Sequence, residues 1–99
     1  MIVKSGDFEE SYEEKCARFD GKGRLPAFED AVADAIRRIE RSPAGFAMNP
    51  HLQIPHVRST RVGENGEFGT IIFKHDEETE NTTLLGLFSK GANIWNKGY

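Results

Sequence analysis

The chain has 99 residues and a formal net charge of −3, with 13 Lys and Arg against 16 Asp and Glu. This length predicts one domain, residues 1–99, and a hydrophobic share of 37% is ordinary for a globular protein. The acidic balance argues against strong non-specific binding to RNA or DNA. No apolar run approaches the roughly 20 residues that span a bilayer. The first residues also lack the apolar core of a signal peptide, so the expected location is cytoplasmic.

The beginning of the chain predicts a short strand followed by a helix. Residues 2–4 can form the strand, and Ser5 or Asp7 can cap the helix. Within residues 8–19 the apolar side chains recur at spacings of four, four and three, which places them on one helical face: Phe8, Tyr12, Cys16 and Phe19. The lone cysteine, Cys16, cannot form an intramolecular disulfide and fits a reducing compartment.

A second helix is predicted to begin near Pro26, because proline suits the first helical position, and to stop at the Ser42–Gly45 segment. Its apolar residues again repeat with helical period: Phe28, Val32, Ile36 and Ile39. Ten of the 16 acidic residues lie in residues 1–41, many of them on the outward faces of these helices. Such charge runs are usually solvated helix exteriors.

The second half of the chain predicts three short strands. Residues 43–55 hold three prolines and are expected to form an irregular loop. Strands follow at residues 56–62, 68–74 and 82–90, and the Gly63–Gly66 turn suits a hairpin because Asn-Gly tolerates positive φ. The predicted fold is α+β: an N-terminal strand and two helices packed on a C-terminal three-stranded antiparallel meander. Both helices should cover one sheet face through four strand residues: Ile71, Phe73, Leu85 and Leu87.

Signatures of metal, nucleotide and triad chemistry are missing from the sequence. The three histidines, His51, His56 and His75, lack metal-ligand spacing, and there is no cysteine pair. The Gly21–Arg24 segment lacks the preceding strand and the Walker pattern of a phosphate loop. No nucleophile-elbow motif supports a Ser-His-Asp triad. We therefore expect no metal and no cofactor.

Polar residues of the meander are the remaining candidates for chemistry. Along an ideal strand side chains alternate between faces, so His56 and Arg58 share one side and Arg61 lies on the other. The two arginines can reach one site only through a bulge or bend. The alternative is that they are ordinary exposed sheet charges, each worth at most about 1 kcal/mol in an ion pair.

The order of these elements and three of their motifs resemble the RelE/ParE/HigB superfamily of toxins. The matching segments are His56–Gly63 (His-Val-Arg-Ser-Thr-Arg-Val-Gly), Gly69–Phe73 (Gly-Thr-Ile-Ile-Phe) and Leu84–Lys90 (Leu-Leu-Gly-Leu-Phe-Ser-Lys). They are similar to the HigB-like pattern, in which an Arg-rich strand precedes an Ile-Ile-Tyr strand and a Leu-Leu-x-x-x-x-Lys strand. The motifs lie in the second half of the chain, and the order of elements extends the likeness to most of it.

This resemblance implies a RelE-like fold and a bacterial toxin of a toxin–antitoxin pair, which inhibits translation as a ribosome-dependent mRNA endonuclease. Its partners would be a cognate antitoxin protein, the ribosome and mRNA. The resemblance also implies that Arg58 and Arg61 hold the phosphate and that Lys90 lies near the leaving group or the RNA backbone, without a metal. His56 or His75 is the candidate acid/base, because histidine ordinarily titrates near neutrality.

The sequence departs from the family pattern in its middle strand. Thr70 stands where an arginine often precedes the Ile-Ile-Tyr-like run, and Phe73 replaces the tyrosine. The chain is also acidic, whereas relatives that act on the ribosome tend to be basic. A second hypothesis is therefore a non-catalytic binding protein on the same scaffold: a toxin directed at DNA gyrase, or a phage- or plasmid-encoded inhibitor of a host factor. A third is an α+β domain of unrelated role.

Overall fold

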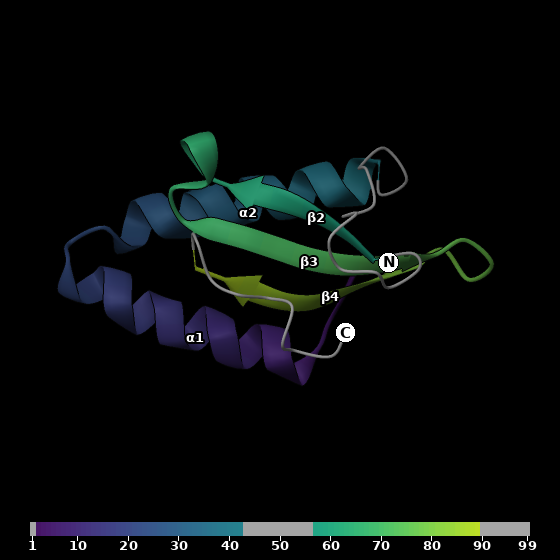
Figure 1. Cartoon of the computed structure of the whole chain (residues 1–99), viewed down its shortest axis with the longest axis horizontal. Coiled ribbons are helices and arrows are strands. Elements are labelled where there is room, and N and C mark those ends of the chain that lie inside the picture. Colours follow the sequence, from purple (N-terminus) through teal and green to yellow (C-terminus); the bar gives the residue numbers. More distant parts are fainter. Residues whose placement is uncertain (1, 43–56, 90–99) are drawn as a thin grey trace.

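The computed structural model describes residues 2–42 and 57–89, which form an α+β fold, as predicted (Figure 1). In chain order the elements are β1 (Ile2–Lys4), α1 (Gly6–Gly21), α2 (Leu25–Arg41), β2 (Val57–Val62), β3 (Gly69–Asp76) and β4 (Asn81–Phe88). A short 3-10 turn, Glu64–Gly66, connects β2 to β3. The predicted Asn-Gly turn is confirmed, since Asn65 and Gly66 have φ values of 56° and 72°.

The sheet differs from the predicted meander in the number and order of its strands. Four strands pair in the order β1-β4-β3-β2, because β1 joins the meander and runs parallel to β4. Ile2 lies opposite Thr82 and Lys4 opposite Leu84, and the Ser5 N–H donates to the Leu84 carbonyl at 3.1 Å. The antiparallel pairing of β2 with β3 and of β3 with β4 is as predicted, but the strand count and order are not: β1 is a fourth strand, β4 is an interior strand, and the sheet is mixed. Side-chain periodicity carries no information about which edge a short strand joins.

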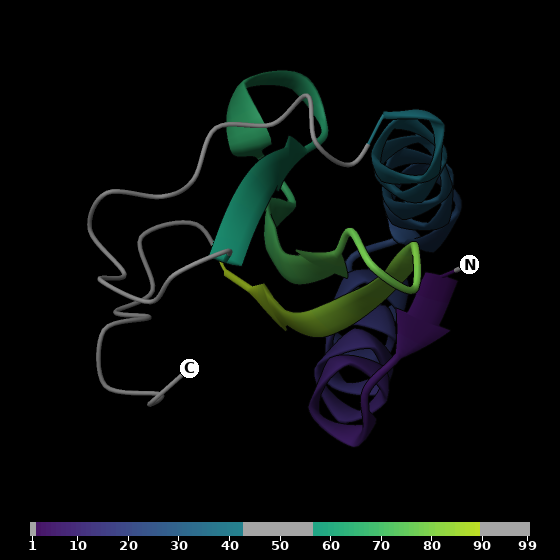
Figure 2. The same cartoon turned by 90° about the vertical axis from the view of Figure 1, so that its right-hand side faces the viewer.

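Both helices pack on the same face of this sheet, as predicted, and Figure 2 shows them together on one side of it. Buried side chains from the helices and strands form the core between the layers: Phe8, Phe28, Val32, Ile39, Ile71, Phe73 and Leu87. Phe28 stacks on Phe19 with 4.9 Å between ring centroids. Tyr12 and Ile36 were expected in this core but are only half-buried, because they line an open groove between the helices.

The helix boundaries follow the capping residues in the sequence. Ser5 is the N-cap of α1, and its hydroxyl accepts a hydrogen bond from the Phe8 N–H at 3.1 Å. Pro26 occupies the first turn of α2, as predicted. Backbone N–H groups in the first turn have no acceptor within the helix, so a proline there costs no hydrogen bond. Gly23, with a φ of +71°, reverses the chain between the two helices. Among the described residues, no helix combines the length and the apolar character needed to cross a membrane.

A β-bulge at Leu85 interrupts the alternation of side chains along β4. The pairing of β3 with β4 shifts register between Ile72 and Phe73, which leaves Leu85 without a partner across the strands. Leu84 and Leu87 therefore both face the helices, although strict alternation would place them on opposite faces. The prediction that Leu85 joins the helix core is wrong. It belongs to a smaller cluster on the other sheet face: Val57, Ile72, Leu85 and Phe88.

Two serines near the start of α1 bind backbone groups at this bulge. The Ser5 hydroxyl donates to the Leu85 carbonyl at 3.1 Å, and the Leu87 N–H donates to the Ser11 hydroxyl at 3.1 Å. A buried backbone group without a partner costs free energy, so these hydrogen bonds offset the interruption of the ladder. They also fix the N-terminal half of α1 to the middle of β4.

Candidate functional site

Three of the five residues predicted to form the site lie in the described part of the chain: Arg58, Arg61 and His75. The other two, His56 and Lys90, lie outside the described residues. Arg58 is half-buried and Arg61 is exposed. The pairing of β2 with β3 continues without a register shift from one end of β2 to the other. Strand alternation therefore places the two arginines on opposite faces of the sheet, and no bulge in β2 brings them together.

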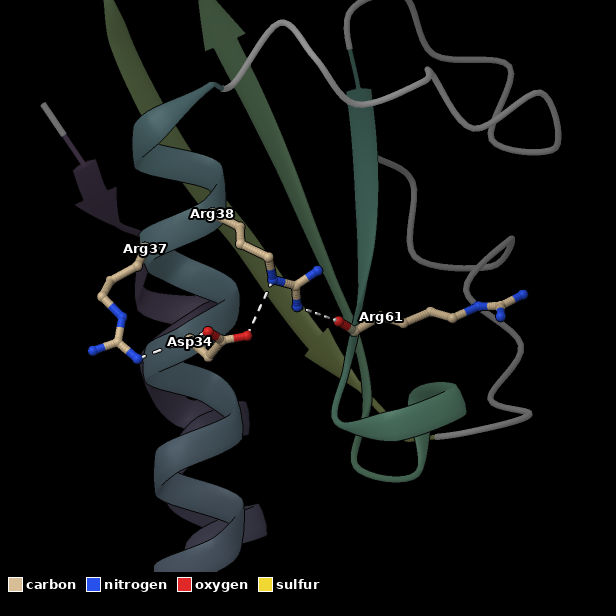
Figure 3. A network of polar contacts seen from close by, with 4 residues as sticks. All are labelled: Asp34, Arg37, Arg38 and Arg61. Carbon is tan, nitrogen blue, oxygen red and sulfur yellow. Dashed lines mark hydrogen bonds and ion pairs between the residues drawn. The ribbon is translucent and has the colours of Figure 1, made fainter.

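The side chain of Arg61 points away from helix α2, although its backbone is held by that helix (Figure 3). Arg38 donates to the Arg61 carbonyl at 3.2 Å and forms an ion pair with Asp34 at 3.2 Å. The stem of Arg61 lies beside Gly66, where an added Cβ would be 3.4 Å from the Arg61 Cγ. The guanidinium of Arg61 is thus available on the sheet face opposite Arg58.

Arg58 and His75 are the predicted site residues that β2 and β3 bring nearest to each other among those described. Arg58 pairs with Phe73, and His75 lies two residues further along β3 on the same face. Such diagonal neighbours are about 7–8 Å apart, and their Cβ atoms are somewhat closer. The ring of His75 is oriented by Thr82, whose hydroxyl lies 2.8 Å from Nδ1.

The surroundings of His75 are acidic. A cavity of about 310 Å³ at the turn between β3 and β4 is lined by Lys74, His75 and three carboxylates: Asp76, Glu77 and Glu78. A hydrogen bond from the Glu78 N–H, at 2.9 Å, lowers the pKa of the Asp76 carboxyl. That carboxylate therefore stays ionised at neutral pH. Negative charge at this turn disfavours a phosphate, so this end of the sheet is a poor surface for RNA.

A cationic cleft lies at the other end of the sheet, beside the C-terminal half of α1. Its volume is about 260 Å³, and its lining comes from α1, the turn after it, the β2–β3 connection and the end of β4: Lys15, Arg18, Phe19, Lys22, Arg24, Glu67, Phe68 and Ser89. Four of these residues are cations and one is a carboxylate, in a chain with a net charge of −3. The cationic cleft therefore concentrates positive charge on an acidic protein.

Arg24 forms one side of the cationic cleft. Its guanidinium lies 3.2 Å from the Glu67 carboxylate and 4.8 Å from the centre of the Phe68 ring. The two side chains of the ion pair are 48% and 42% exposed. An ion pair this exposed contributes at most about 1 kcal/mol, so an anionic ligand can compete with Glu67 for Arg24.

The other three cations lie along one face of α1 and at its C-cap, Lys22. Lys15, Arg18 and Lys22 are separated by three and four residues, which aligns them toward the C-terminus of the helix. Arg18 donates to the Ser89 hydroxyl at 3.2 Å, and the Lys22 Nζ lies 5.8 Å from the centre of the Phe19 ring. Cations near a helix C-terminus favour its dipole, which accounts for part of this pattern. The helix dipole does not explain why these three cations line the same cleft as Arg24.

None of the four cations of this cleft is among the residues predicted from the sequence. A sequence signal was present, because Lys15, Arg18 and Lys22 repeat with helical spacing. The position of Arg24 and Ser89 beside them depends on how the helix hairpin meets β4, which local patterns do not report.

No protein-family model and no curated protein matches this sequence. In residues 2–42 and 57–89, no group of three or more His, Cys, Asp or Glu side chains is placed to hold a metal ion.

Proposed function

We propose that this protein is the toxin of a toxin–antitoxin pair and inhibits translation in the cytoplasm by contacting ribosome-bound mRNA through the cationic cleft. The observation that carries the proposal is the cleft, in which four cations and one carboxylate surround a cavity of about 260 Å³. Guanidinium and ammonium groups are the usual protein partners of phosphate oxygens. The RelE-like arrangement implied by the resemblance supplies the toxin role and the cognate antitoxin as partner.

The cleft residues suit different parts of such a contact. Arg18 and Lys22 are exposed, and they present a guanidinium and an ammonium to a phosphate. Arg24 can exchange its exposed carboxylate partner for a phosphate oxygen. The Ser89 hydroxyl, which accepts a hydrogen bond from Arg18, can donate its own proton to a further oxygen.

Dependence on the ribosome follows from the charge of the whole chain. With a net charge of −3 the protein has little long-range attraction for free RNA. A ribosome holds mRNA at a fixed place, so a small local patch of positive charge is enough to make the contact. In a metal-free cleavage the 2′-hydroxyl gives its proton to a base and attacks the adjacent phosphorus, which forms a 2′,3′-cyclic phosphate. The bond from phosphorus to the 5′-oxygen breaks, and that oxygen takes a proton from an acid and leaves as a hydroxyl. Cations stabilise the negative charge that builds up on the phosphorane.

A second candidate function is a non-catalytic binding protein on the same scaffold, directed at DNA gyrase or another host protein. One observation favours it. Arg58 and Arg61 lie on opposite sheet faces, and His75 lies beside an acidic turn, so the described part of the predicted catalytic set does not converge.

The test of the lead proposal is induced expression in bacteria, combined with mapping of mRNA ends in translating extracts. Arg18→Glu with Lys22→Glu should reduce growth arrest and translation inhibition about tenfold or more, since each reversal replaces attraction for phosphate by repulsion. The matched control is Arg37→Glu with Arg41→Glu, which makes the same change in net charge at exposed positions of α2 outside the cleft. The control pair should retain activity.

The same extracts separate an enzyme from a binder. If the protein is a nuclease, replacing His56 by glutamine should lower cleavage by about 100-fold when His56 is the acid/base. His75 lines the acidic turn and not the cleft, so His75→Gln should leave cleavage through the cleft unchanged. A harmless wild type, or equal loss of activity in the cleft pair and the control pair, contradicts the cleft proposal. Translation inhibition without any new mRNA ends would favour the non-catalytic candidate.

A further inference from the structure

A third cavity, of about 450 Å³, lies between the N-terminal half of α1 and helix α2. Five apolar or aromatic side chains line it: Phe8, Tyr12, Val32, Ala33 and Ile36. Phe8 and Val32 are buried in the core, whereas Tyr12 and Ile36 are half-buried and face the cavity. The apolar surface that a ligand can reach is therefore mainly that of Tyr12, Ile36 and the exposed Ala33.

The rim of this cavity is acidic, and we call the whole the acid-rimmed groove. Glu9 and Glu13 from α1 and Glu29 from α2 are exposed, and Lys4 is the cation in the lining. Glu9 and Glu13 are four residues apart, which separates them by about 6 Å along the helix axis. In the described part of the chain, the ion pairs use Asp34 and Glu67 as acids, and none uses a rim glutamate.

Helix stability explains only part of this arrangement. A carboxylate in the first turn favours the dipole of α1, which accounts for Glu9. It does not account for Glu13 in the middle of the helix, or for Glu29 on the opposite wall. Carboxylates around one apolar floor repel one another unless a cation lies between them. The chemistry of the groove therefore suits a ligand that is both apolar and cationic.

We propose that the acid-rimmed groove binds a Lys- or Arg-bearing amphipathic helix of a partner protein. Apolar side chains one turn apart on that helix pack on Tyr12 and Ile36. Cations with the same spacing pair with Glu9 and Glu13, and a further cation pairs with Glu29. A helix fits because the walls are themselves two helices, whose side-chain ridges accept a third. This goes beyond RNA contact, because the groove and the cationic cleft share no lining residue.

The test uses the intact, isotope-labelled chain and a designed peptide of about 18 residues, roughly five helical turns. The probe carries leucines on one face and lysines beside them, and a second peptide has glutamate in place of every lysine. The lysine peptide should shift the backbone amide signals of residues 8–13 and 29–36. The glutamate peptide should leave them unchanged, because it meets the rim with like charge.

A matched pair of variants checks that the rim is responsible. Glu9→Lys, Glu13→Lys and Glu29→Lys together should weaken binding of the lysine peptide about tenfold or more. The control combines Glu10→Lys, Glu14→Lys and Asp30→Lys, which change the net charge equally on the same two helices at exposed positions outside the groove. Its affinity should match that of the unmodified chain.

Several outcomes would overturn the proposal. Equal binding of both peptides would show that charge does not determine binding. Signal shifts only outside residues 8–13 and 29–36 would show that the peptide binds elsewhere than in the groove. A concentration-dependent dimer that dissociates in the rim variant would make a second copy of this chain the occupant. Circular dichroism verifies that each variant is folded, and the corresponding glutamine variants replace any lysine variant that is not. Translation inhibition is also measured on the rim variants. Because the groove and the cleft share no lining residue, peptide binding tests the groove proposal and translation inhibition tests the cleft proposal.

Discussion

Helix α1 carries two surfaces of opposite charge, and they are held to the sheet by different kinds of contact. Its N-terminal half lines the acid-rimmed groove and is tied to β4 by partly buried hydrogen bonds of Ser5 and Ser11. Its C-terminal half lines the cationic cleft and meets the end of β4 through the exposed contact of Arg18 with Ser89. Buried contacts define a fixed shape, whereas exposed ones exchange readily with water or a ligand. The contact of Arg18 with Ser89 should therefore exchange more readily than the contacts of Ser5 and Ser11.

The largest expected effect is on the shared support of the two surfaces. Phe28 is fully buried and stacks on Tyr12 at the groove and on Phe19 at the cleft, with centroid distances of 5.6 Å and 4.9 Å. Phe28→Ala should lower the free energy of unfolding by about 3–5 kcal/mol, through lost burial and a cavity. Urea unfolding followed by circular dichroism measures this. Phe28→Leu keeps more of the volume and should cost less. Equal costs for the two variants would mean that ring packing does not join the surfaces.

The difference in anchoring should appear directly in stability. Ser5→Ala removes the N-cap of α1 and the donor to the Leu85 carbonyl, and Ser11→Ala removes the acceptor of the Leu87 N–H. Each should cost about 1–2 kcal/mol. Ser89→Ala, at the exposed end of the helix, should change stability by less than about 0.5 kcal/mol. Thermal and urea unfolding of the three variants provide the comparison. If Ser89→Ala lowered stability as much as Ser11→Ala, the proposed difference in anchoring between the two halves of α1 would be contradicted.

A smaller effect is expected for the ion pair at the cleft. A double-mutant cycle with Arg24→Ala and Glu67→Ala should give a coupling energy below about 1 kcal/mol that falls as salt is added, because both side chains are exposed. Glu67→Gln should strengthen any anion contact at the cleft, since it frees Arg24 without enlarging the cavity. A coupling well above 1 kcal/mol would mean that Arg24 is committed to Glu67 and is a poor phosphate partner.

The smallest effect concerns a titration at the groove. Burial first, then a hydrogen bond to Cys16 and the negative charge of Glu29, raise the pKa of Tyr12 from 10.0 to about 12. The folded state thus holds this proton more tightly than the unfolded state. The resulting stability is complete below pH 10 and is lost as pH rises toward 12. Tyrosinate absorbance in a Tyr99→Phe background follows Tyr12 alone, and Glu29→Gln should lower its pKa. An unchanged titration in Glu29→Gln would contradict the influence of the rim charge.

Local patterns in the sequence were enough for the helices and for the segments that became strands. The spacing of Phe8, Tyr12, Cys16 and Phe19, the serine cap and Pro26 act within a few residues, so they can be recognised without knowing the rest of the fold. The same holds for the Asn-Gly turn and for the alternation that puts Arg58 and Arg61 on opposite faces.

Contacts between residues far apart in the sequence determine the features of the fold that local patterns do not predict. The parallel pairing of β1 with β4 joins residues from opposite ends of the chain, and the bulge at Leu85 is accommodated by serines of a helix far away in sequence. The cationic cleft arises because the turn after α1, the β2–β3 connection and the end of β4 meet at one end of the sheet. Periodicity assigns a side chain to a face of its own element. Which charges then gather into one surface depends on the packing of elements that have no sequence proximity.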